Sequence, residues 1–158
     1  MSYMHITIKH IKNIIGIILF LIASILITSN SHSEQSAEEV IKDRKALFSK
    51  NYKIAKRVQS LSNGVEFDSA KELMIKMSEN YKNLLELFPE NSKEGFKTSS
   101  LPFIWEDKEN FNLLMQKSSD DMVKLASLIE TADDINLSIK QLMWSNCKAC
   151  HSKYRQPH

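Results

Sequence analysis

Apolar residues recur every three to four positions through most of the chain after residue 33, which is the spacing of a helix with one buried face. The repeat predicts four helices, over about residues 37–61, 69–88, 102–131 and 133–154. The positions expected to face inward in the first helix are Val40, Arg44, Leu47, Phe48, Tyr52, Ala55, Val58 and Leu61. Those of the second helix are Leu73, Met77, Tyr81, Leu84, Leu85 and Phe88.

Polar residues at the expected helix starts support these bounds. Ser36 with Glu39, and Ser69 with Glu72, have the spacing of capping boxes, in which each side chain bonds a free backbone amide of the other residue. Asp133 is a suitable cap for the fourth helix.

The segments between and within the helices complete the predicted fold. The polar run Ser118–Asp121 contains weak helix formers and predicts a kink in the third helix. The connection Pro89–Leu101 is longer than usual loops in bundles, and it is a candidate for wrapping the edge of a cofactor. Four amphipathic helices without a strand pattern predict an all-α protein, an antiparallel four-helix bundle that occupies residues 34–158 as one domain.

The first 33 residues have the pattern of an export signal. Lys9 and Lys12 precede the uncharged apolar run Ile14–Ile27, and Ser31-His32-Ser33 places small residues where a signal peptidase reads them. A membrane-spanning helix needs roughly 20 apolar residues, so the run is short for a span. The pattern predicts a signal peptide over residues 1–33, cleavage after Ser33 and a periplasmic protein, with an uncleaved membrane anchor as the alternative.

Charge argues against a nucleic-acid partner. The full chain has 21 lysines and arginines and 19 acidic residues, and the signal segment contributes Lys9 and Lys12 but no acid. The mature part therefore carries 19 residues of each sign, and this balance gives no basis for binding nucleic acid.

The candidate chemistry lies near the C-terminus, in Cys147-Lys148-Ala149-Cys150-His151. C-x-x-C-H is the attachment motif of c-type haem: the two thiols add to the porphyrin's vinyl groups, and the histidine becomes the proximal iron ligand. One haem c per chain is predicted, held through Cys147 and Cys150, with His151 on the metal. Export agrees with this prediction, because c-type haem is attached outside the bacterial cytoplasm.

Two other uses of the cysteines compete with haem. A redox-active disulfide normally lies on a strand–helix unit, and no strand pattern is present. A structural zinc site needs more ligands than Cys147, Cys150 and His151 supply, and the chain has no other cysteine.

Helical spacing places the motif on one face of the fourth helix, together with Tyr154. Haem is therefore expected inside the bundle, against this helix. Arg155 follows His151 by four residues and lies either beside the proximal imidazole or at the helix C-terminus as a cation favoured by the helix dipole.

The motif and three weaker patterns resemble one known family. Cys147-Lys148-Ala149-Cys150-His151-Ser152-Lys153-Tyr154-Arg155 matches the C-x-x-C-H-x-x-[YF]-R of class II cytochromes c. The chain from about residue 36 to 156 is most similar to a cytochrome c′, an antiparallel four-helix bundle with covalent haem. The other matching stretches are Val40–Phe48, Leu87–Pro89, Pro102–Trp105 and Phe111.

The resemblance implies further cofactor-binding residues. It places Arg44 on a haem propionate, and a lone arginine on an apolar helix face independently needs an anion, unless it extends to solvent. Lys45, Ser99 and Ser100 correspond to positions at the haem edge, although a glutamine is common in place of Lys45. Phe48 corresponds to the bulky residue over the iron.

The sixth iron position separates the candidate functions. Residues 37–61 contain neither methionine nor histidine, and Phe48 cannot ligate iron, so a five-coordinate haem is expected. The primary prediction is a cytochrome c′-type protein that transfers electrons or binds NO or CO in preference to oxygen, since Phe48 offers no hydrogen-bond donor. The alternative is a low-spin, six-coordinate electron carrier. An enzyme such as a peroxidase is not expected, because it needs a distal acid–base group.

The sequence names no redox partner protein. The resemblance also implies a possible homodimer through the first helices, for which Tyr52, Ile54 and Val58 supply either the surface or internal packing.

Overall fold

The computed structural model of this chain describes residues 35–157, so the predicted signal peptide, residues 1–33, lies outside the described part. Within that part the secondary structure is helical, apart from one isolated antiparallel bridge between Ser100 and Arg155. The elements are α2 (Ala37–Asn63), α3 (Phe67–Leu85), η1 (Glu90–Ser92), α4 (Phe103–Glu106), α5 (Lys108–Leu128), α6 (Ile135–Ile139), η2 (Lys140–Trp144) and α7 (Ser145–Tyr154).

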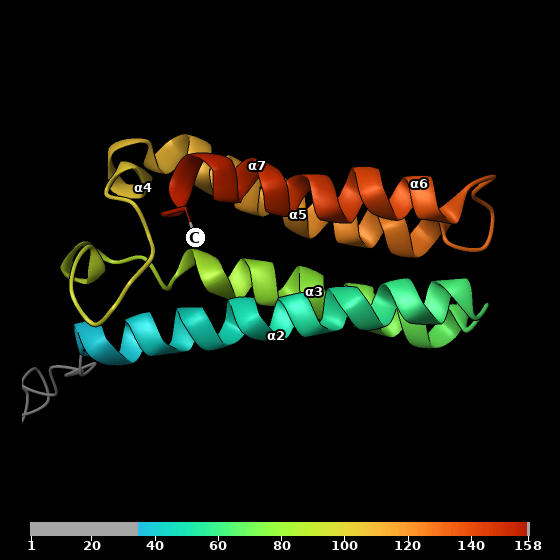
Figure 1. Cartoon of the computed structure of the whole chain (residues 1–158), viewed down its shortest axis with the longest axis horizontal. Helices are drawn as coiled ribbons and strands as arrows, with labels where there is room; N and C mark the ends of the chain where they lie inside the picture. The colour runs from blue at the N-terminus through green and yellow to red at the C-terminus, as the bar shows by residue number, and fades with distance from the viewer. Residues whose placement is uncertain (1–34, 158) are drawn as a thin grey trace, which may run out of the picture. The chain divides into compact units, whose positions relative to one another are not determined.

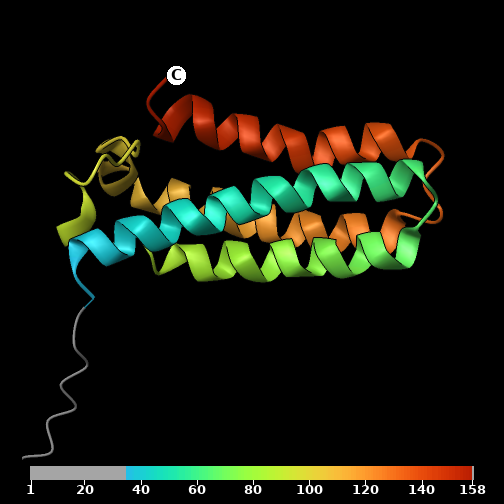
Figure 2. The ribbon, with the colours of Figure 1, turned by 60° about the horizontal axis from the view of Figure 1, so that its bottom comes forward.

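The predicted four-helix bundle is confirmed. α2 and α3 form one layer, and α5 packs beside the rod made by α6, η2 and α7 in the other (Figure 1). The two short connections lie at one end of the bundle and the long connection at the other, as antiparallel rods require (Figure 2). The core joins all four rods and includes the five described methionines, Met74, Met77, Met115, Met122 and Met143, each at most 1% exposed.

Of the three helix caps predicted from the sequence, one is present in the structure and two are not. Ser36 and Glu39 form the predicted capping box of α2. The box predicted for Ser69 is wrong, because α3 begins two residues earlier, after Glu66, whose side chain makes no capping bond. Asp134, rather than Asp133, caps the fourth rod by accepting a bond from the amide of Leu137.

The predicted kink in the third helix is also wrong. α5 runs unbroken through Ser118–Asp121, because these polar side chains find partners, two of them within α5 and two on neighbouring helices. The Ser119 hydroxyl lies 2.8 Å from that of Ser78 on α3, and Asp121 accepts a bond from Asn146 on α7. The third helix predicted over residues 102–131 is instead divided at Asp107 into α4 and α5. The fourth rod also contains an irregular segment, since Lys140–Trp144 is a π-helix.

None of the described helices is long and apolar enough to span a membrane.

Candidate haem-binding site

The fourth rod presents both cysteines at the bundle interior. Cys147 and Cys150 are half-buried on α7, their thiols are not bonded to each other, and Cys150 packs against the core. Asn146 fixes this turn, since its Nδ2 donates to Asp121 Oδ2 and to the carbonyl of Leu142, both at 2.8 Å. The π-helix directly before α7 changes the rotation of the chain, a feature that is frequent at functional sites.

The environment of the thiols favours their neutral form. Burial, followed by the proximity of Cys147, raises the pKa of Cys150 to about 11, and burial also raises the pKa of Cys147. The Tyr81 hydroxyl on α3 lies 4.0 Å from Cys147 Sγ, and burial raises the pKa of this phenol. Among the described residues, no group of three or more histidines, cysteines and acids is placed to hold a metal ion.

The end of α7 is anchored by Tyr154. This buried side chain donates a 2.7 Å hydrogen bond to Asp107 Oδ2, stacks on Phe103 and meets the edge of Phe111. Lys153 donates to the same oxygen at 2.6 Å. His151, one turn before these residues, is exposed, and it stays the predicted iron ligand.

Asp107 should make this anchor sensitive to acid. Hydrogen bonds from Lys153, Asn110 and Tyr154 lower its pKa from the usual 3.8 to about 2. Because the folded pKa lies below the unfolded one, the stabilisation is complete above 3.8 and disappears as the pH falls toward 2. The free energy of unfolding should therefore decline over this interval in the parent protein, as measured by urea unfolding at each pH.

The control for this acid effect is a second carboxylate. Asp107→Asn should remove part of the decline, whereas Asp68→Asn, at a side chain that is 97% exposed, should retain it. Equal pH profiles for the parent and Asp107→Asn proteins would contradict the assignment.

Arg44 connects α2 to the long connection. It is 1% exposed and donates four hydrogen bonds. Nη1 donates to Leu87 O (3.3 Å) and Ser92 Oγ (2.8 Å), and Nη2 donates to Ser92 O (2.9 Å) and Thr98 Oγ1 (2.7 Å). The alternative to the predicted propionate contact, in which this side chain extends to solvent, is therefore wrong.

The surroundings of Arg44 fit an anionic group. Burial lowers its pKa to about 10, so the guanidinium remains charged at neutral pH. Its carbon Cζ lies 4.8 Å from the Phe88 ring centre, and no carboxylate within residues 35–157 forms an ion pair with it. Its buried Nε has no hydrogen-bond partner in the described part of the chain. A buried cation with an unused donor suits a carboxylate such as a haem propionate.

The long connection joins Arg44 to the haem-attaching helix. Thr98 Oγ1 accepts bonds from Arg44 and from the Ser100 amide, and the amide of Gln156 donates to Ser99 O at 2.9 Å. The Ser100–Arg155 bridge continues this contact at the end of α7. Arg44 and its hydrogen-bond partners Leu87, Ser92 and Thr98 form the Arg44 cluster. Ser99 and Ser100 thus lie between this cluster and α7, and their contact with a cofactor stays a prediction.

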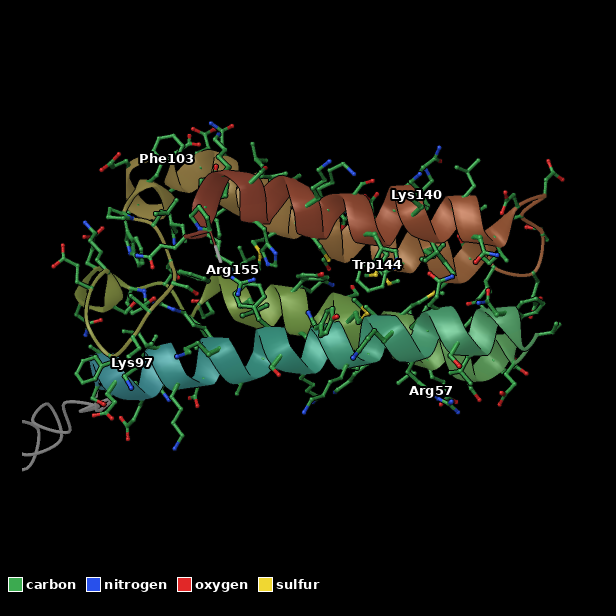
Figure 3. The ribbon with its side chains drawn as sticks, viewed as in Figure 1. Arg57, Lys97, Phe103, Lys140, Trp144 and Arg155 are labelled. Atoms are coloured by element: carbon green, nitrogen blue, oxygen red, sulfur yellow. The ribbon has the colours of Figure 1, made fainter. Side chains whose placement is uncertain are left out.

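Lys45 and Arg155 lie at the two sides of this connection. The Lys45 Nζ donates to Lys97 O at 3.2 Å, beside an open hollow of about 430 Å³. Arg155 is half-buried at the C-terminal cap of α7, and Figure 3 shows it at that end of the helix. The cap position agrees with the dipole explanation for Arg155, and its predicted position beside the imidazole stays a prediction.

The face of α2 differs from the sequence prediction in one respect. Phe48 is partly buried and meets the edge of Phe88, with ring centres 6.4 Å apart. Tyr52 is 57% exposed and packs outside the core against Trp144, whereas Val58 is fully buried. Asn51, not Tyr52, therefore occupies the inward position.

Sequence reasoning missed the buried pair Asn51 and Asn80. Asn80 Nδ2 donates to Asn51 Oδ1 at 2.7 Å, and both residues are 3% exposed. The signal was present in the sequence: Asn51 follows Arg44 by seven residues, so a polar residue interrupts the apolar face of the first helix.

Comparison with known proteins agrees with this site. The family model described as Cytochrome C′ matches residues 39–155. The cytochrome c′ of Rhodopseudomonas palustris is 31% identical over 120 residues, which cover 74% of this chain and 82% of that protein. The crystal structure of cytochrome c′ from Rubrivivax gelatinosus has a TM-score of 0.66 at 24% identity, over 77% of this chain and 98% of that one. A cytochrome c′ structure from Alcaligenes xylosoxidans has a TM-score of 0.67 at 19% identity, over 79% of this chain and 99% of that one. This chain belongs to the cytochrome c′ family, whose members bind haem c covalently.

Proposed function

We propose that this protein is a periplasmic haem protein of the cytochrome c′ type, with a five-coordinate iron that binds NO or CO and passes electrons. Cys147 and Cys150 would hold the porphyrin through thioethers, and His151 would ligate the iron. The haem would supply a redox-active iron that can bind a small ligand. The N-terminal pattern Lys9–Ser33 supports export from the cytoplasm.

The observation that carries this proposal is the composition of the inner face of α2. Within α2 neither methionine nor histidine is present, and Phe48 has no atom able to ligate iron. The described methionines lie on α3, α5 and η2, and their side chains are buried in the core. At the position of Phe48 the protein therefore places a bulky apolar ring beside the iron, and no side chain of α2 there can act as a sixth iron ligand.

The residues of the Arg44 cluster support the same placement of the haem. The unused Nε of Arg44 binds a propionate, while Ser99 and Ser100 border the cofactor at the connection with α7. Lys45 lies at the outer side of this connection, where its ammonium adds positive charge near the same edge.

The side chain of Phe48 also supports selectivity among gases. Oxygen gains from a nearby hydrogen-bond donor more than NO or CO does, and a phenylalanine ring has none. A cytochrome c′ structure from Alcaligenes xylosoxidans is that of a ferrous variant with bound NO. By this reasoning NO and CO are the preferred small ligands of the present protein.

Absorption spectra test the proposal. The ferrous protein should change its spectrum under NO and under CO, and should form no long-lived complex under oxygen. A persistent oxygen spectrum would contradict the proposed selectivity. A methionine-to-iron charge-transfer band in the resting ferric protein would identify the alternative, a six-coordinate electron carrier.

A further inference from the structure

The side-chain amide of Asn51 is only partly satisfied in the bundle interior. Its Oδ1 accepts the bond from Asn80, while its Nδ2 is buried and has no partner among residues 35–157. A buried donor without an acceptor loses its water and gains nothing in return, so native interiors contain few of them. We therefore expect the acceptor for Asn51 Nδ2 to be an atom of a bound ligand.

The position of Asn51 connects it to the haem site. It follows Phe48 by three residues and Arg44 by seven, so all three lie on the inner face of α2. Its partner Asn80 directly precedes Tyr81, whose hydroxyl approaches Cys147 Sγ. The unpaired amide thus lies between α2 and α3, in the part of the bundle where α3 meets the haem-attaching cysteine.

We propose that Asn51 Nδ2 donates a hydrogen bond to the diatomic ligand held on the open face of the haem. This inference rests on the proposed function, because it requires a vacant iron position beside Phe48. Asn80 acts as a positioning residue: its bond to Oδ1 turns the other end of the Asn51 amide toward the ligand. Phe48 then limits the space for a ligand, and Asn51 supplies the polar contact that Phe48 lacks.

The effect of one amide donor is modest, and it applies to bound oxygen as well as to NO and CO. One net hydrogen bond changes an equilibrium or a dissociation rate by about fivefold. Such a factor adjusts how long a gas stays bound. It narrows the discrimination against oxygen that is expected from Phe48 and does not remove it, so the oxygen complex should still be short-lived.

The experiment uses the haem-loaded protein and the variant Asn51→Leu, which keeps the branched shape and the number of heavy atoms of the side chain and removes the donor. The C–O stretching frequency of the carbon monoxide complex should rise, because a donor to the ligand lowers it. NO should dissociate about fivefold faster. Asn80→Leu, which retains the Asn51 donor but releases its orientation, should give a smaller shift in the same direction.

The matched control is the other buried polar pair of α3, Ser78 with Ser119. Ser78→Ala with Ser119→Ala removes a hydrogen bond of the interior without touching α2, and it should leave the stretching frequency unchanged. Circular dichroism checks that each variant is folded. If the Asn51 variants fail to fold, production of the parent protein in heavy water replaces them, since deuterium on Nδ2 should shift the stretching band.

The outcomes separate the two proposals. A parent protein that binds CO with the same frequency as folded Asn51→Leu, or that shows no shift in heavy water, overturns the role of Asn51 and leaves the proposed function intact. An equal shift in the Ser78 and Ser119 control also overturns it. A ferrous parent protein that binds neither CO nor NO contradicts the proposed function itself.

Discussion

Replacing both Cys147 and Cys150 with serine should abolish covalent attachment of haem. The two thiols are the chain's only cysteines, and they lie one helical turn apart on the half-buried face of α7, so no other residue can form a thioether. Intact-mass measurement after denaturation should give the polypeptide plus one haem for the parent protein and the bare polypeptide for the double variant. A single replacement should leave one thioether and a more weakly retained cofactor.

The matched control for the cysteine variant lies on the same helix. Ser152→Ala removes an exposed hydroxyl that donates to the Ala149 carbonyl, and the haem mass should remain. The same measurement tests export, since cleavage after Ser33 gives a chain that begins at Glu34. A parent protein without added porphyrin mass would contradict the proposed function.

Arg44→Met should cause a large loss of stability. It leaves the carbonyls of Leu87 and Ser92, and the hydroxyl of Thr98, without the guanidinium that satisfies them. Removal of one partner from a buried charged network costs about 3–5 kcal/mol. This is a large part of a typical unfolding free energy of about 5–15 kcal/mol.

Urea unfolding of the haem-loaded protein, followed by circular dichroism, measures this loss. Arg57→Met provides the control, because Arg57 is an exposed arginine on the same helix and its replacement should change the unfolding free energy by less than about 0.5 kcal/mol. Equal stability of the Arg44→Met and Arg57→Met proteins would contradict the role of Arg44 as the link between α2 and the long connection.

Local patterns in the sequence were sufficient to predict the four-helix fold and the haem cofactor. The helical repeat identified all four rods, because each helix must bury one continuous apolar face whatever its neighbours are. The Ser36 capping box was also predicted correctly, since both partners lie within one turn. The attachment motif Cys147–His151 is likewise local, and its chemistry is fixed by residue type and spacing.

Predictions that depended on contacts between helices were less successful. The run Ser118–Asp121 indicated a kink because its residues are weak helix formers, yet the partners Ser78 and Asn146 keep α5 continuous. Tyr52 was expected inside the bundle, and the rotation of α2 against α3 places Asn51 there instead. Propensity and periodicity do not contain this information, since both ignore the neighbouring helix.

The sequence by itself determined that this protein is a four-helix bundle with a haem-attachment motif at its C-terminal end, because periodicity, capping and motif spacing are properties of short segments. Only the tertiary structure decided which atoms meet at the site. The partners of Arg44 lie 43 to 54 residues away along the chain, and the acceptor and donor of the Asn51–Asn80 pair are 29 residues apart. Such contacts arise when the packed core sets the rotation of each helix, and this rotation leaves one guanidinium and one amide with donors available to a ligand.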